Sequence, residues 1–220
     1  MPKTRNFGST LILSALVLLG FLPVLATIGR MIVRFGDVGA PADLVADSSR
    51  FFAMPTVVIM HVIGGCLFTL IGALQFSSGL RRGPWHRISG RVMVVAGLLA
   101  GVSSLALTQF YPPLPSDGPF LYWFRWAAGL GLVWSLAVGF RMARNRRFDQ
   151  HRANMTRAYA LGLGPSTQML IGIPWVLVAG QPDPVTSDLL LGASWAINLA
   201  VAQWTLHRRS PGPGLARVST

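Results

Sequence analysis

Long apolar runs separated by short polar segments form the main pattern of the chain. Because a bilayer core about 30 Å thick takes roughly 20 mostly apolar residues of helix to cross, each such run predicts a membrane-spanning helix. The pattern therefore predicts an all-α fold, a six-helix transmembrane bundle that forms a single integral membrane domain over residues 1–220. The six predicted helices cover residues 10–33, 53–76, 89–111, 120–142, 155–179 and 188–206.

The two ends of the chain are predicted to frame this bundle. Lys3 and Arg5 precede the first apolar run as in a signal peptide, but the run is too long for one and shows no clear small-residue cleavage site. We therefore expect an uncleaved helix there. The core of the domain is expected at residues 53–179, with peripheral helices at 10–33 and 188–206 and a flexible tail at 208–220.

Composition also favours a membrane protein. The chain is 52% hydrophobic and only 12% charged, whereas soluble domains carry about 25% charged residues. The hydrophobic content and the 10% of aromatic residues exclude a disordered chain. The net charge of +12 then has two interpretations: a nucleic-acid-binding surface, or the positive cytoplasmic face of a polytopic membrane protein.

The positions of the charges decide between these interpretations. Fifteen of the 19 Lys and Arg residues fall at the N-terminus, in the connections between helices two and three and between helices four and five, and in the C-terminal tail. Six crossings place all of these on one side, and six of the seven acidic residues on the other. The positive-inside rule then predicts a multi-pass protein of the cell inner membrane with both termini in the cytoplasm. No soluble domain remains to bind nucleic acid, so the expected partners are membrane lipids, whose anionic head groups contact the basic loops.

Two of the basic connections resemble each other. Residues 81–91 and 146–157 each contain two consecutive arginines, then a His-Arg pair at the start of the next helix, then a further arginine. This similarity indicates a parallel repeat in which helices two and three match helices four and five.

Three blocks of the sequence also resemble a known family. The blocks are HVIGG at residues 61–65 with GALQF at 72–76, HR at 86–87 with GR at 90–91, and HR at 151–152 with Met155 and RAYAL at 157–161. Together, over residues 53–175, they resemble the predicted membrane protein family catalogued as domain of unknown function 2306. The resemblance implies a multi-pass bacterial membrane protein and brings no established activity.

Histidines at the membrane edge are rare enough to be candidates for function. His86 and His151 begin two helices at the same depth, so one imidazole from each is expected to reach a common centre, as the axial ligands of one b-type haem do. Neighbouring arginines would neutralise the haem propionates. The predicted cofactor-binding set is His86, His151, Arg87, Arg91, Arg152 and Arg157, with the two histidines as the candidate ligands of the haem iron.

The same basic residues support a second hypothesis. Positive side chains at a helix N-terminus oppose the helix dipole, so a lipid phosphate or another anion would be favourable there. On this hypothesis the protein is a non-enzymatic carrier or a lipid- or anion-binding membrane protein. A zinc site is disfavoured, because this edge offers only Asp149 beside the two histidines. The sequence leaves open which hypothesis holds and whether the protein is an enzyme.

A second candidate pocket is expected in the outer half of the bundle. His61 lies about 12 Å into the second helix, at 1.5 Å per residue, near the level of one arginine and two glutamines. These residues are predicted to bind an anionic ligand; the alternative is that the arginine extends to the outer surface between two tryptophans. Pro165 and Pro174 are expected to break or kink the fifth helix at this level and free backbone carbonyls. The predicted set is His61, Gln109, Arg125 and Gln168.

Overall fold

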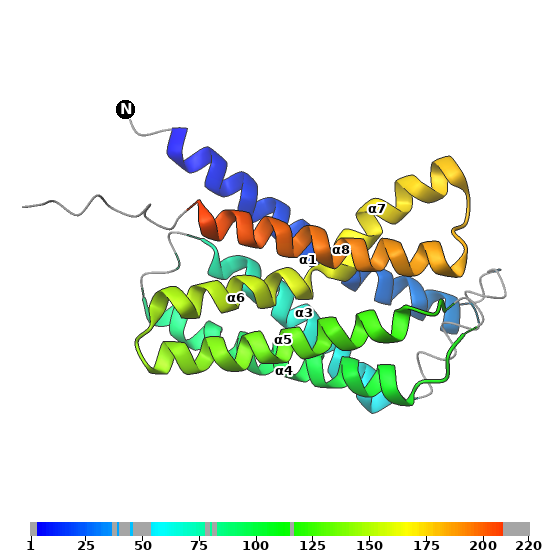
Figure 1. The fold of residues 1–220 in the computed structure, drawn as a ribbon, viewed down its shortest axis with the longest axis horizontal. Coiled ribbons are helices and arrows are strands. Elements are labelled where there is room, and N and C mark those ends of the chain that lie inside the picture. Colours follow the sequence, from blue (N-terminus) through cyan, green and yellow to red (C-terminus); the bar gives the residue numbers. More distant parts are fainter. Residues whose placement is uncertain are drawn as a thin grey trace, which may run out of the picture.

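The fold is entirely helical over the part of the chain that the structure describes. The computed structural model describes residues 4–36, 54–77, 83–114 and 117–208, together with the single residues 39, 45 and 80. Within the four longer ranges the chain forms seven helices, most of which run lengthwise through the molecule (Figure 1). They are α1 (Thr4–Phe35), α3 (Pro55–Gln75), α4 (Pro84–Phe110), α5 (Leu121–Arg144), α6 (Phe148–Gly162), α7 (Gly164–Ala179) and α8 (Pro184–His207).

The helices have the length and apolarity of membrane spans. Among the described residues, α1, α3, α4, α5 and α8 can each cross a membrane, and α6 with α7 forms a pair bent by 42° that can serve as a sixth span. This confirms the all-α six-span bundle. Two starts differ from the prediction, because α4 begins at Pro84 rather than at residue 89 and α6 at Phe148 rather than at residue 155. The polar first turns of these helices hid their starts from a search for apolar runs.

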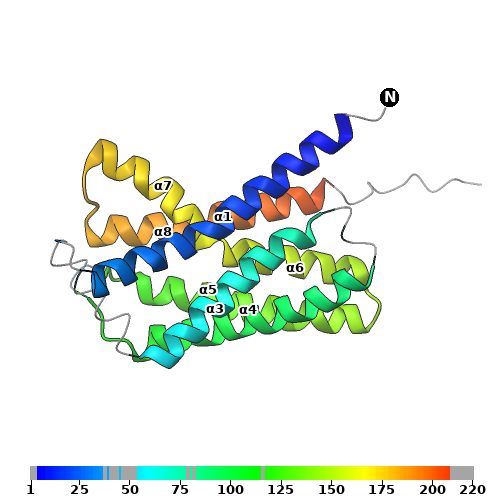
Figure 2. The ribbon, with the colours of Figure 1, turned by 180° about the vertical axis from the view of Figure 1, so that it is seen from behind.

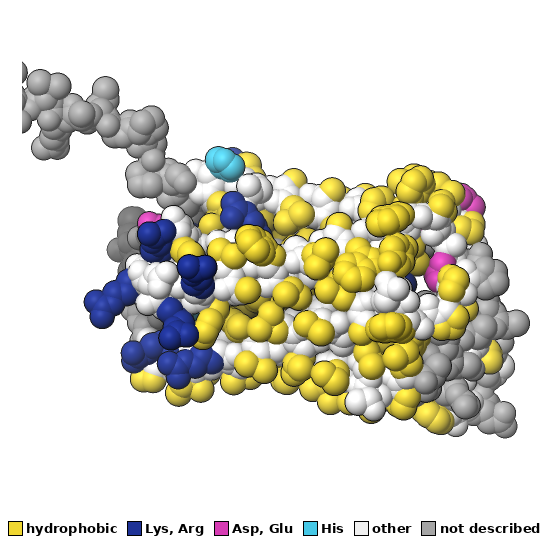
Figure 3. Space-filling model, turned by 60° about the horizontal axis from the view of Figure 1, so that its bottom comes forward, with side chains coloured by type: hydrophobic (Ala, Val, Ile, Leu, Met, Phe, Trp, Pro, Cys, Tyr) yellow, Lys and Arg dark blue, Asp and Glu magenta, His cyan; other side chains and the backbone are white. Residues whose placement is uncertain are grey.

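Charge separates along the bundle. On the face that Figure 3 shows, Arg side chains gather at one end and apolar side chains are spread along the rest. We call this the basic end; it comprises the starts of α4 and α6 and the ends of α3, α5 and α8. The first turn of α1 also lies at this end (Figures 1 and 2). The remaining predicted basic positions at residues 3, 81, 82, 209 and 217, and the predicted tail beyond residue 208, lie outside the described residues.

A tightly packed centre joins α3, α4, α5 and α6. Phe68 of α3 is 1% exposed and lies against Leu136 of α5, which is fully buried. Its ring fits because Gly97 of α4 and Gly162 of α6 have no side chain; a Cβ at either position would collide with the ring. Small residues that allow close helix approach are the usual means of packing helices within a bilayer. The two glycines thus set the close spacing of the four helices, whose ends form the basic end.

The flanking helices pack differently from each other. Helix α1 lies against α3 and α7 and keeps most of its side chains at the surface. Helix α8 packs against α5, α6 and α7 and buries Asp188, Leu191 and Ser194. Asp188, 2% exposed, accepts backbone N–H groups from Gly118, Phe120 and Leu121 at 3.3, 2.8 and 3.0 Å. Because α5 has no side-chain cap of its own, this carboxylate from α8 satisfies the donors at its start.

The break between α6 and α7 has a local cause. Pro165 carries no N–H, so the carbonyl of Leu161, four residues earlier, loses its helical donor. The indole Nε1–H of Trp195 in α8 takes that place at 3.0 Å. Beside it, Asn198 donates to the carbonyl of Ala160 at 3.1 Å. The carbonyl freed by the proline is therefore held by α8, whereas α7 continues through its second proline without a break.

Replacing Trp195 by phenylalanine should lower the free energy of unfolding by about 1 kcal/mol. The change removes the indole donor of the Leu161 carbonyl, which then keeps only the backbone N–H at the C-cap of α6, and one hydrogen bond contributes about 0.5–1.5 kcal/mol net. Reversible unfolding by SDS in mixed micelles would measure the loss. The matched control is Trp134→Phe, at a position that is 71% exposed on the bundle surface, where no change is expected. Equal losses in the two variants would show that the indole hydrogen bond contributes nothing.

Candidate functional site

A cavity of about 720 Å³ lies at the basic end between α3, α4, α5 and α6. This volume falls within the range of about 300–1,000 Å³ that is usual for small-molecule and cofactor sites. The first turns of α4 and α6 form part of its wall, and a short turn joins α5 to α6. Arg146, in the left-handed region with φ 59°, makes that turn.

Two histidines of the basic end, His86 and His151, line this cavity. His86 lies in the first turn of α4, and its Nδ1 is buried. His151 lies in the first turn of α6, with Nδ1 2.8 Å from the carbonyl oxygen of Gly139 in α5. Since a carbonyl only accepts, Nδ1 of His151 carries the proton, and in the neutral ring Nε2 then holds the free lone pair. His151 is thus oriented from behind by a backbone hydrogen bond.

Four arginines share the cavity wall. Arg87 and Arg91 come from α4, Arg144 from the last turn of α5 and Arg152 from α6. None of the described residues that line the cavity is acidic. The site is therefore strongly positive, and the N-termini of two helices add to the potential.

One predicted arginine lies elsewhere. The Nε of Arg157 donates to the side-chain oxygen of Gln203 in α8 at 2.9 Å, and Arg157 is not among the described residues that line the cavity. Arg144, which does line it, was not singled out from the sequence. Its place in the last turn before the second basic connection was the available signal.

Apolar and aromatic side chains close the inner part of the cavity. Tyr159 of α6 packs with Phe76 of α3 at 5.1 Å between ring centroids, and its hydroxyl donates to the carbonyl of Thr69 at 2.9 Å. Its ring occupies the space that a side chain at Gly72 would need. Met93 and other apolar residues of α4, α5 and α6 complete this part. Tyr159 and Gly72 lie within the sequence blocks shared with the family, and the sequence pattern predicts no role for them in the site.

A hydrogen bond holds the wall between α3 and α4 in place. The Nε2 of Gln75, in the last turn of α3, donates to the hydroxyl of Ser89 at 2.7 Å, and this hydroxyl donates to the carbonyl of Trp85 at 2.6 Å. Gln75 lines the cavity, so this hydrogen bond fixes the end of α3 beside the start of α4.

The outer pocket residues are only partly together. His61 Nδ1 lies 3.0 Å from the carbonyl oxygen of Ala100 and 3.4 Å from the hydroxyl of Ser103, both in α4. Arg125 of α5 is half-buried and close enough to act electrostatically on His61. These two predicted residues therefore stand near each other.

The two predicted glutamines have other surroundings. Gln109 is exposed, and its side-chain oxygen accepts a hydrogen bond from the hydroxyl of Tyr122 at 2.9 Å. Gln168 lies on α7, which packs against α1 and α8. A ligand held by all four residues stays a prediction.

The described residues contain no group of three or more His, Cys, Asp or Glu side chains that could hold a metal ion. A haem held by two histidines would not require such a group, because the porphyrin supplies the other ligands of the iron.

Fold and site together define a helical, multi-span integral membrane protein with a basic cavity at one end of its bundle. The model of the family described as "Predicted membrane protein (DUF2306)" matches residues 58–206, and the chain belongs to this family. The match confirms the resemblance drawn from the three sequence blocks. No curated protein and no solved structure matches the chain. The family places the protein in a membrane and states no activity.

Proposed function

We propose that the basic cavity binds an anionic ligand with an apolar body and that the protein serves as a carrier or receptor for it. The observation that carries the proposal is the set of four arginines and two histidines around one cavity, with no acidic residue among the described lining. Guanidinium groups gathered in a site partly shielded from water repel one another unless an anion joins them. The apolar inner part then suits the body of the ligand.

The orientation of the protein in the membrane indicates from which side the ligand enters. The positive-inside rule assigns the basic end and both termini to the cytoplasm, and the membrane to the cell inner membrane. The ligand would then enter from the cytoplasm or the inner leaflet. The starts of α4 and α6 would direct their N-terminal N–H groups toward its charge.

Haem b is the second candidate ligand. His86 and His151 would hold the iron, and Arg87, Arg91 and Arg152 would pair with the propionates. The hydrogen bond from Nδ1 of His151 to a backbone carbonyl favours this candidate, because histidines that bind metal usually donate their other N–H in this way. Bound haem would supply one-electron transfer, and the protein would then act as an electron carrier.

One pair of probes separates the two candidates: protoporphyrin IX and its iron complex hemin, each added to protein in phosphatidylcholine nanodiscs. Both carry two carboxylates on an apolar ring. We expect protoporphyrin IX to bind, and the double variant Arg87→Gln/Arg152→Gln to weaken it about 30-fold, taking about 1 kcal/mol for each charge. The matched control, Arg141→Gln/Arg146→Gln, removes two exposed arginines of the same end that are not among the described lining residues. An equal loss in the control would overturn the anion proposal.

Hemin tests the histidines. If haem is the ligand, hemin gives a Soret band typical of two histidine ligands, and His86→Ala and His151→Ala each abolish that form while protoporphyrin IX still binds. A hemin spectrum that neither substitution changes ends the haem candidate. The anion proposal would still stand on the protoporphyrin IX result.

A further inference from the structure

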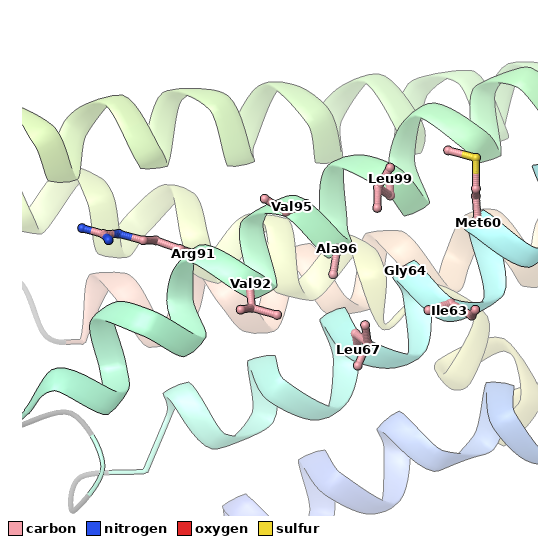
Figure 4. Close-up of a pocket in the computed structure, with 9 residues that line it drawn as sticks. All are labelled: Met60, Ile63, Gly64, Leu67, Arg91, Val92, Val95, Ala96 and Leu99. Atoms are coloured by element: carbon pink, nitrogen blue, oxygen red, sulfur yellow. The ribbon is translucent and has the colours of Figure 1, made fainter.

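A second hollow lies on the outer surface of the bundle and shares only Arg91 with the described lining of the basic cavity. It is a groove of about 360 Å³ between α3 and α4 (Figure 4). Its floor is the contact of the two helices, where Gly64 meets Ala96; a Cβ at Gly64 would lie 2.7 Å from the carbonyl oxygen of Ala96. Because the backbones approach so closely there, the larger side chains stand on either side and leave a channel between them.

The walls of the groove are apolar and exposed. Ile63 and Leu67 of α3 are 55% and 42% exposed, and Val95 and Leu99 of α4 are 58% and 40% exposed. Both helices are membrane spans, so the medium that meets these side chains is lipid acyl chain rather than water.

The groove ends at a positive charge. Arg91, exposed on α4, is its residue nearest the basic end and extends beyond it toward that end (Figure 4). From Arg91 to Leu99 the groove follows α4 for about 12 Å at 1.5 Å per residue. One leaflet contributes about 15 Å of hydrocarbon, half of the bilayer core. The length of the groove thus approximately matches one acyl chain, and the guanidinium group of Arg91 lies at the level of the lipid head group.

We propose that the groove between α3 and α4 binds an anionic phospholipid, with one acyl chain along Gly64 and Ala96 and the phosphate at Arg91. A guanidinium group is well suited to a phosphate, which it can contact through two N–H groups. Arg91 also lines the basic cavity, so the lipid phosphate would lie next to the cavity that binds the proposed anion. The lipid site does not depend on the ligand of that cavity.

Native mass spectrometry tests the proposal on protein equilibrated with equal amounts of phosphatidylglycerol and phosphatidylcholine. The wild type is expected to retain phosphatidylglycerol in preference. Arg91→Gln should lower that preference about fivefold, the worth of one arginine near an anionic surface. Val95→Trp fills the groove and should remove the retained lipid; Ile63→Trp does the same from the other wall, should the first variant fold poorly.

The control for the groove is Val102→Trp, on the same helix and 55% exposed but outside the groove. It should retain lipid as the wild type does. Wild-type retention in both Val95→Trp and Ile63→Trp would overturn the proposal, as would equal retention of the two lipids by the wild type. Protoporphyrin IX binding should be unchanged in Val95→Trp, which separates a failure of the groove from a failure of the cavity.

Discussion

Replacing Asp188 by alanine is expected to lower the free energy of unfolding by about 3 kcal/mol. The carboxylate is almost fully buried and accepts the N–H groups of Gly118, Phe120 and Leu121 at the start of α5. Alanine would leave these donors without an acceptor, and each buried unsatisfied group costs about 1–3 kcal/mol. The lower part of that range applies, because the site lies near the end of the span, where water can replace part of the loss. SDS-induced unfolding, followed by circular dichroism, would measure it.

Two further variants distinguish the hydrogen bonds of the buried Asp188 carboxylate from the effect of removing any negative charge. Asp188→Asn keeps one acceptor oxygen and should lose less stability than alanine. Asp183→Ala removes the exposed cap of α8, where the Thr186 hydroxyl and the N–H groups of Thr186 and Val185 lower the pKa of the carboxyl. Because that pKa is lowered, the contribution of Asp183 is present at neutral pH and is lost as the pH falls through the lowered value. Its removal should matter less than that of Asp188; a larger effect of Asp183→Ala would contradict the role of the buried cap.

The spans could be predicted because apolar length alone determines them, whereas the break at Leu163 could not be located. Two prolines mark the fifth predicted span, yet only the first separates two helices. What stabilises the break there is Trp195, a residue of another helix that donates to the freed carbonyl. A contact between helices distant in sequence leaves no periodic signal in either of them.

The candidate site, too, could be predicted from the sequence only in part. His86, His151 and their neighbouring arginines could be singled out because the chain has only four histidines and is only 12% charged, so a histidine beside clustered arginines is conspicuous. Helical spacing could have improved the set further: at 100° per residue, Arg157 stands about 140° around α6 from Arg152, and it faces α8 in the structure. Tyr159, by contrast, became part of the site only through the packing of α6 on α3, which the sequence pattern does not reveal.

Replacing Phe68 by alanine should cost about 3 kcal/mol of stability and also weaken the cavity. Phe68 is 1% exposed between α3, α4 and α6, and large-to-small substitutions of buried aromatic residues typically cost about 3–5 kcal/mol. The lower value is expected because helix association in lipid rests mainly on packing rather than on hydrophobic transfer. The ring also lies 6.0 Å from that of Tyr159, between centroids, so the inner wall of the cavity loses its support.

The functional part of this prediction distinguishes packing from general destabilisation. In Phe68→Ala, protoporphyrin IX binding should fall at temperatures where the protein is still folded, because Tyr159 can move into the vacated space. Phe68→Leu, which keeps most of the volume, should retain binding and most of the stability. The matched control Phe110→Ala, at a position 69% exposed at the other end of α4, should change neither quantity. If Phe68→Ala lost stability but bound the probe as the wild type does, the cavity would depend on its basic rim alone, and the apolar inner part would have no share in binding.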